Sequence, residues 1–286
     1  MSLQISQQAW PAPAKLNLFL HITGRREDGY HLLQSVFQFL DYADTLRFQL
    51  RDDGRIRLQH PLPGVAVESD LVVRAARLLQ SHCAITQGVD IAVEKILPMG
   101  GGLGGGSSDA ATTLVALNQL WQCRLDDETL AQLGLSLGAD VPVFVRGEAA
   151  WAEGVGEQLT PVTLPEPWFV VLCPAVEVAT GDVFAASQLR RDCRPITIRD
   201  FLADVAVQNV CEPVVRQHYP EVAAALDALN RHAAARMTGT GACVFAAFET
   251  QAMAHRAFTA LSGNWPGFVA RGRNTSPLKR LTTSAS

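Results

Sequence analysis

Residues Pro98-Met99-Gly100-Gly101-Gly102-Leu103-Gly104-Gly105-Gly106-Ser107-Ser108-Asp109-Ala110-Ala111 form the most informative stretch of the sequence. Six of the first nine are glycine, and the stretch leads into residues 112–121, where Leu114, Leu117 and Trp121 recur at helical spacing. Glycine permits positive φ angles and lets the backbone approach a ligand closely. The start of a helix adds unpaired N–H groups and the positive end of the helix dipole. The stretch therefore predicts a phosphate-binding loop.

Two familiar phosphate-binding patterns overlap this loop, and neither fits. Gly100-x-Gly102-x-x-Gly105 matches the dinucleotide-binding fingerprint, which occurs by chance inside any glycine run. That fingerprint should follow a buried parallel strand, whereas residues 89–95 alternate charged and apolar side chains like a strand with one exposed face. Gly101-x-x-x-x-Gly106 matches the start of a Walker A motif, but Ser107 stands where that motif requires lysine. A flexible linker that binds nothing is the remaining alternative, and the helix that follows disfavours it.

The composition is that of a globular protein with one large or two ordinary domains. The chain has 286 residues, of which 48% are hydrophobic and 18% charged. Its net charge of −4 disfavours a nucleic-acid-binding surface. The six cysteines include no Cys-x-x-Cys pair, which argues against a zinc site and a disulfide framework. Because the sequence shows no signal-peptide pattern and no stretch as long as a membrane span, we expect a cytoplasmic protein that contacts no membrane.

Residues 12–22 are expected to form the first strand. Alternation places Lys15, Asn17, Phe19 and His21 on one face and four aliphatic residues on the other. Because the aliphatic face belongs to the core, Lys15 and Asn17 should share a polar surface. An ordinary solvated strand face is equally compatible with this segment taken alone.

Asp140 lies between the end of a predicted helix at Gly138 and a predicted strand over 141–145. Pro142 restricts the chain at this point, so we expect the carboxylate to be held rigidly and partly buried. A buried carboxylate without a partner is unfavourable, and Asp140 should therefore face a cation or a hydrogen-bond donor. A structural cap or turn aspartate is the alternative.

The remaining elements mix without regular βαβ repetition, which predicts an α+β fold with two subdomains divided near residue 160. In the first half we expect strands at 35–40, 45–50, 55–58 and 89–95, and helices at 71–83 and 126–138. In the second half we expect strands at 168–173 and 267–271, a glycine turn feeding a strand within 236–246, and helices at 180–189, 198–219, 221–235 and 251–261.

Three motifs follow one another along the chain: Pro13-Ala14-Lys15-Leu16-Asn17, the glycine loop over 98–111, and Thr238-Gly239-Thr240-Gly241-Ala242. Together they resemble the GHMP kinases, and the resemblance spans nearly the whole chain. Further matches bring the chain closest to members that phosphorylate a cytidine-diphosphate-linked alcohol on the route to isoprenoid precursors. These matches are Asp28-Gly29-Tyr30-His31, Leu137-Gly138-Ala139-Asp140-Val141-Pro142 and Asn274-Thr275-Ser276-Pro277-Leu278. Residues 190–219 carry no motif of the family.

The resemblance implies a fold and a reaction. The fold would have a ribosomal-protein-S5-like N-terminal domain over 1–160 and a ferredoxin-like C-terminal domain over 161–286, with the active site between them. The reaction would transfer the γ-phosphoryl group of ATP, with Mg²⁺, to an alcohol. Asp140 would orient or accept the hydroxyl proton, and Lys15 would steer Asp140 and stabilise negative charge. A nearby lysine makes a carboxylate a weaker base, but the loose transition state needs little base strength, so we favour orientation.

The resemblance also implies two sets of binding residues. The ATP phosphates would contact Pro98, Gly100, Gly101, Gly102, Leu103, Gly104, Gly105, Gly106, Ser107 and Ser108. The cytidyl substrate would contact Asn17, Tyr30, His31, Thr180, Phe184, Gly239 and Thr240. Within the second set, Tyr30 and Phe184 would stack on the base and His31 would form a hydrogen bond with it.

There are two alternatives to this interpretation, and the second belongs to a different functional class. One is another GHMP kinase that acts on homoserine or a sugar, which the segment Asp28 to His31 disfavours. The other is a nucleotide-binding module without catalysis, which would be expected to have lost Lys15 or Asp140. The expected partner is the small-molecule substrate, with no nucleic acid, and a homodimer is compatible with the sequence. The sequence identifies neither the Mg²⁺ ligands nor the adenine pocket.

Overall fold

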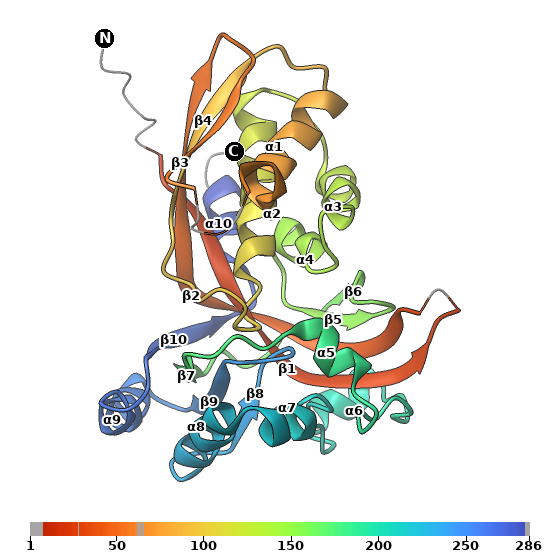
Figure 1. The fold of residues 1–286 in the computed structure, drawn as a ribbon, viewed down its shortest axis with the longest axis vertical. Helices are drawn as coiled ribbons and strands as arrows, with labels where there is room; N and C mark the ends of the chain where they lie inside the picture. The colour runs from red at the N-terminus through yellow and green to blue at the C-terminus, as the bar shows by residue number, and fades with distance from the viewer. Residues whose placement is uncertain (1–7, 28, 62–63, 65, 284–286) are drawn as a thin grey trace.

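Two long antiparallel strands, β1 (Trp10–Arg25) and β2 (His31–Arg51), run through both halves of the molecule (Figure 1). The computed structural model describes residues 8–27, 29–61, 64 and 66–283. The other elements of the first half are β3 (Ile56–Gln59), a short 3₁₀ helix (Val67–Ser69), α1 (Leu71–His82), β4 (Gly88–Glu94), α2 (Gly105–Leu120), α3 (Asp127–Leu135), α4 (Val141–Arg146), β5 (Ala150–Glu153) and β6 (Gln158–Pro161). Those of the second half are β7 (Trp168–Leu172), α5 (Thr180–Ala185), α6 (Ile198–Leu202), α7 (Glu212–His218), α8 (Pro220–Asn230), β8 (Ala235–Met237), β9 (Val244–Phe248), α9 (Gln251–Leu261), β10 (Gly267–Arg273) and α10 (Pro277–Thr283).

One mixed sheet connects the two halves. β2 pairs antiparallel with β1, β4, β5 and β10, while β3 lies parallel to β4. Beyond β2, β10 pairs with β7, β7 with β9, and β9 with β8, which gives the strand order β3-β4-β2-β10-β7-β9-β8. The junction is the pairing of Gly272 and Arg273 with Leu40 and Phe39. Strands and helices mix without βαβ repetition, so the predicted α+β class is confirmed.

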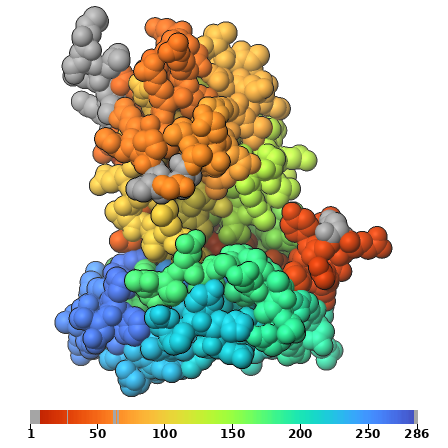
Figure 2. Space-filling model, viewed as in Figure 1, coloured from red at the N-terminus to blue at the C-terminus, as the bar shows by residue number. Residues whose placement is uncertain are grey.

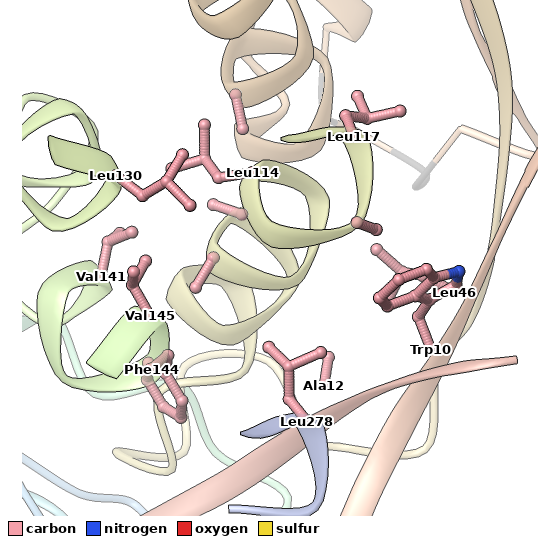
Figure 3. Close-up of a cluster of buried hydrophobic side chains, with 14 of the residues drawn as sticks. Trp10, Ala12, Leu46, Leu114, Leu117, Leu130, Val141, Phe144, Val145 and Leu278 are labelled. Carbon is pink, nitrogen blue, oxygen red and sulfur yellow. The ribbon is translucent and has the colours of Figure 1, made fainter. Parts of the chain in front are cut away.

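The core of the first half forms between the β1–β2 ribbon and helices α1 to α4 (Figure 3). Leu114 and Leu117, predicted from helical spacing, lie fully buried in α2. Trp10 of β1 packs edge-on against Phe48 of β2 on the sheet side of this core. Leu278, from the last helix of the chain, packs into the same core. The C-terminal segment therefore returns to the first half of the fold.

The core of the second half lies between α7, α8 and α9 and the strands β7 and β9. Leu20 and Ile22 of β1 belong to it, so this core also takes residues from the other half. Figure 2 shows the two halves stacked, with elements of the first half in orange to lime above those of the second half in green to blue. The division into residues 1–160 and 161–286 stays a prediction.

The predicted elements differ most from the structure at three places. The segments 35–40 and 45–50 form the single strand β2, because the polar residues between them have partners: Asp41 accepts from the Arg271 N–H (2.6 Å) and Asp44 from the Leu97 N–H (2.8 Å). Residues 141–145 belong to helix α4 and not to a strand. The predicted strand is wrong because a continuous apolar run that is buried on all sides shows neither the helical nor the strand period. Pro142 fits the first turn of that helix, where its missing N–H has no partner to lose.

The third difference concerns residues 198–219, which form two short helices instead of one long one. The segment between them joins the edge of β1: Leu20 donates to the Gln208 carbonyl (3.1 Å), and Val210 donates to the Leu20 carbonyl (2.9 Å). Strand β1 itself has bulges, one of them between Asn17 and Leu20. The expected common face of Lys15, Asn17, Phe19 and His21 is therefore interrupted, and Phe19 packs in a buried cluster with Val36 and Trp151.

Two expectations about composition can be compared with the structure. All six cysteines are free thiols. Within the part of the chain that the structure describes, none of the helices is both long enough and apolar enough to cross a membrane.

Candidate active site

A cavity of about 630 Å³ lies where the glycine loop, strand β1, the turn 238–241 and helix α5 meet. Residues from all three sequence motifs line it: Lys15 and Asn17, most of the glycine loop, and Gly239, Thr240 and Gly241. Residues that are far apart in the chain are therefore brought to one site.

The glycine loop is shaped by glycines that adopt conformations other residues avoid. Gly100, Gly102 and Gly104 have φ angles of 66°, 75° and 74°. Helix α2 begins at Gly105, directly after Gly104 in the left-handed region, so the unpaired N–H groups of its first turn lie beside the cavity. A Cβ atom on Gly102 would lie 2.2 Å from the Thr238 carbonyl oxygen. Glycine is thus required where the loop touches the turn 238–241.

Lys15 and Asp140 form an ion pair at the wall of the cavity. The Lys15 ammonium lies 3.2 Å from Asp140 Oδ2 and donates to Asn17 Oδ1 (2.5 Å) and to the Gly102 carbonyl (3.2 Å). Lys15 is only 3% exposed, so the alternative of an ordinary solvated strand face is wrong. The Asp140 side chain is 34% exposed and lines the cavity, so it faces a cation and is partly buried, as predicted.

Asn17 holds the lysine in place. Its amide nitrogen donates to Ser35 Oγ (2.8 Å), which leaves Oδ1 to accept from Lys15. Its backbone N–H donates to Thr238 Oγ1 (3.0 Å), and the Thr238 hydroxyl in turn donates to the Gly102 carbonyl (3.1 Å). Strand β1, the glycine loop and the turn 238–241 are therefore joined by one hydrogen-bond network around the ion pair.

Of the three residues expected to bind a base, Phe184 on helix α5 lines the cavity, and Tyr30 and His31 do not. Phe184 lines the cavity, and the His31 ring stacks on it with 5.2 Å between ring centroids and 20° between planes. Thr180 lines the cavity and shares a hydrogen bond of 2.9 Å with Thr240 across to the turn. Tyr30 is 65% exposed at the end of the β1–β2 hairpin and, like His31, is outside the cavity lining.

Two predicted phosphate-binding residues also lie outside the cavity lining. Leu103 is buried, and its carbonyl accepts the Lys15 N–H (3.0 Å). Ser108 is fully buried, and its hydroxyl has no hydrogen-bond partner within the described part of the chain. Because α2 starts at Gly105, Ser108 already points inward, whereas Ser107 lines the cavity.

Sequence reasoning did not assign Lys95, which lines the cavity between two carboxylates. Its ammonium donates to Asp44 (2.5 Å) and Asp109 (2.7 Å), and Asp109 also lines the cavity. Burial raises the pKa of Asp109 to about 7, against the opposing effect of Lys95. The scarcity of lysine, which occurs at three positions only, is the one sequence signal that points to Lys95.

An apolar wall beyond the helix start was also not predicted. It consists of Leu58, Leu71, Val72, Val93 and Met99. Such residues resemble ordinary core in a sequence, and only the fold shows that they face a cavity. Their place next to the glycine loop makes them the candidate adenine surface.

Comparisons with known proteins agree with this geometry. Residues 70–148 match the family described as GHMP kinases N terminal domain, and residues 196–267 match GHMP kinases C terminal. The chain is 62% identical to the 4-diphosphocytidyl-2-C-methyl-D-erythritol kinase of Nitrosococcus oceani over 94% of this chain and 96% of that one. It is 58% identical to the enzyme of the same name from Pseudomonas putida over 96% of each chain. The crystal structure of a 4-(cytidine 5'-diphospho)-2C-methyl-D-erythritol kinase superposes with a TM-score of 0.81 at 33% identity, over 93% of this chain and 99% of that one.

Proposed function

The chain belongs to the GHMP kinases, and within them to the 4-diphosphocytidyl-2-C-methyl-D-erythritol kinases; from this premise we propose which reaction it catalyses and how. It transfers the γ-phosphoryl group of ATP to the 2-hydroxyl of 4-diphosphocytidyl-2-C-methyl-D-erythritol, giving the 2-phosphate and ADP. This reaction is a step of the non-mevalonate route to isoprenoid precursors. The observation that carries the proposal is the Lys15–Asp140 pair (3.2 Å), set in one cavity between the glycine loop and Phe184.

The glycine loop binds the phosphates of ATP with backbone groups. N–H groups at the start of α2 point toward the anion with the positive end of the helix dipole behind them. This explains how a chain of net charge −4, with Ser107 in place of a Walker lysine, supplies positive potential at one point. The apolar wall beside α2 receives the adenine.

The catalytic pair acts on the acceptor hydroxyl. Asp140, on the exposed side of the pair, orients the 2-hydroxyl and takes its proton as the new P–O bond forms and the bond between the β-phosphate oxygen and the γ-phosphorus breaks. Lys15 holds Asp140 and stabilises the negative charge on the transferring group. The transition state of phosphoryl transfer is loose, so positioning and charge stabilisation matter more than base strength.

A Mg²⁺ ion fits the residues present. Asp109 Oδ1 is buried without a partner among the described residues, and Asp109 and the Ser107 hydroxyl line the cavity. In the described part of the chain no group of three His, Cys, Asp or Glu could hold a metal, so the phosphates and water supply most ligands. When bound, the ion neutralises phosphate charge; a cation there also favours the ionised form of Asp109.

The second side of the cavity binds the cytidyl substrate. Phe184 and Tyr30 stack on the base and His31 forms a hydrogen bond with it, while Asn17, Thr180, Gly239 and Thr240 lie near the diphosphate and the polyol. Tyr30 is exposed in the free protein and closes on the base when it binds. Two further expectations accompany this proposal. The free cysteines favour a location in the reducing cytosol, and a homodimer stays a prediction.

The test is ADP release by the purified protein with Mg-ATP, with and without 4-diphosphocytidyl-2-C-methyl-D-erythritol. Asp140→Asn should lower kcat by about 10²-fold or more, the usual worth of a positioned acid–base group, and leave the KM for ATP within about 2-fold, because Asp140 does not hold the nucleotide. The matched control is Asp127→Asn, an exposed acid on α3, which should behave like the parent. Turnover with homoserine but not with the cytidyl substrate would discard the proposed substrate. Full turnover by Asp140→Asn would discard the proposed mechanism.

A further inference from the structure

Arg191, in the stretch that matches no family motif, is clamped by backbone carbonyls next to the base-binding side of the cavity. One terminal nitrogen of its guanidinium donates to the carbonyls of Phe184 and Ala186, both at 2.8 Å, and the other donates to the Leu189 carbonyl at 3.1 Å. The Nε–H group donates to His31 Nε2 across 3.1 Å. A planar guanidinium held at three points has a fixed direction for its fourth hydrogen bond.

The segment that carries Arg191 is itself attached to both strands of the β1–β2 hairpin. The Cys193 N–H donates to the Ile22 carbonyl on β1 (2.9 Å). On β2, the Gln34 side chain exchanges two hydrogen bonds with the backbone of Ile196, both at 3.0 Å. Arg191 and His31 therefore keep their relative positions without a ligand.

This contact determines which ring nitrogen of His31 carries the proton. Arginine is always charged and only donates, so His31 Nε2 must accept, and the neutral ring carries its proton on Nδ1. Burial, then the charges of Arg191 and of Arg25 on β1, lower the pKa of His31, which keeps the ring neutral near pH 7.

We propose that Arg191 is a positioning residue that holds His31 as the Nδ1–H tautomer, so that His31 presents a hydrogen-bond donor to a pyrimidine base and favours cytosine over uracil. The inference rests on the proposed function only for the identity of the base. Ring atom N3 of cytosine is an acceptor, which matches an N–H donor, whereas N3 of uracil carries a proton and would face that donor unfavourably. The His31 ring stacks on Phe184, and Phe184 lines the cavity, so a base that binds against Phe184 lies next to His31.

The tautomer can be tested without substrate. Long-range ¹⁵N–¹H NMR spectra of histidine-labelled protein at pH 8 should show His31 with a protonated Nδ1 and an unprotonated Nε2. Arg191→Met should change this to a mixture or to the Nε2–H form. Arg190→Met is the matched control, because Arg190 is exposed and pairs with Asp192 (3.2 Å). A wild-type His31 protonated on Nε2, or a tautomer that Arg191→Met leaves unchanged, would overturn the proposal.

The base preference can be tested separately from catalysis, by calorimetric binding of cytidine and uridine diphosphates with a non-hydrolysable ATP analogue filling the nucleotide site. At pH 8, Arg191→Met should weaken cytidine diphosphate binding roughly 3- to 10-fold, the worth of one hydrogen bond, and should weaken uridine diphosphate binding less or strengthen it. The measurement is repeated at pH 5.5: removal of the Arg191 charge favours protonation of the His31 ring, and because a protonated ring carries both N–H groups, the cytidine loss should shrink. Equal losses for both nucleotides at both pH values would show a merely structural role and refute the inference. Because neither experiment requires turnover, a failure of the proposed reaction leaves both results interpretable.

Discussion

Gly102 joins the two sides of the active site, and its replacement by alanine should be among the most damaging small changes in the chain. Its φ of 75° is a left-handed conformation, and an added Cβ would lie 2.2 Å from the Thr238 carbonyl oxygen and 3.2 Å from that of Gly241. Since an ordinary contact begins near 3.4 Å, the loop and the turn would have to separate by about 1 Å.

The magnitude follows from what that separation breaks. The left-handed conformation costs a residue with a Cβ about 1 to 2 kcal/mol. The Gly102 carbonyl accepts hydrogen bonds from Thr238 (3.1 Å) and Lys15 (3.2 Å), and each is worth about 1 kcal/mol. Gly102→Ala should therefore lower the free energy of unfolding by about 3 to 4 kcal/mol. Because Lys15 loses a partner, kcat should also fall.

The assay is urea unfolding of Gly102→Ala beside Gly106→Ala. Gly106 is helical, and its added Cβ would make only an ordinary contact of 3.5 Å with Leu71. Alanine in a helix is favoured over glycine by up to about 1 kcal/mol, so Gly106→Ala should keep or gain stability, while its methyl group, facing the cavity, raises the KM for ATP. A loss below about 1 kcal/mol for Gly102→Ala, or equal losses for the two variants, would refute the reasoning.

Three further predictions concern single side chains. Tyr30→Ala should raise the KM for the cytidyl substrate several-fold, since a stacked aromatic pair is worth about 1 kcal/mol, and leave the unfolding free energy unchanged, because Tyr30 is largely exposed; unchanged substrate affinity would contradict the stacking role. Ser108→Ala should stabilise the protein by about 1 kcal/mol in urea unfolding, because the buried Ser108 hydroxyl has no hydrogen-bond partner among the described residues, and a loss of stability would show that the hydroxyl is bonded. Burial lowers the pKa of His21, so the folded state binds fewer protons than the unfolded state and stability falls as pH drops below about 6.5. His21→Gln should show a smaller fall between pH 7 and 5, and an identical fall would mean that His21 is not involved.

The parts of the site that could be predicted from the sequence depend on local chemistry. A glycine run before a helical period determines its own backbone shape, so the loop was predictable without its surroundings. The need of Asp140 for a positively charged partner was predictable for a similar reason, because a rigid, partly buried carboxylate requires a cation in any fold. The partner's identity, Lys15, came only from the family resemblance, since the two lie far apart in the sequence.

The parts that could not be predicted depend on long-range contacts. Lys95 contacts Asp44 from 51 positions away, and no period or spacing connects them. Helix α4 is apolar at each position from Val141 to Val145, so neither the helical nor the strand period is visible. In the sequence Arg191 cannot be distinguished from a surface arginine, and only the fold places it beside His31.

The central claim is that Lys15 and Asp140 act as one catalytic unit on the acceptor hydroxyl, and a double-mutant cycle on kcat tests it most directly. Lys15→Met, Asp140→Asn and the double variant should be assayed with saturating Mg-ATP and 4-diphosphocytidyl-2-C-methyl-D-erythritol. Residues that act as a unit are strongly non-additive. The account predicts that the double variant has a kcat within about 2-fold of the slower single variant. Losses that multiply would show that the two residues act independently and would contradict it.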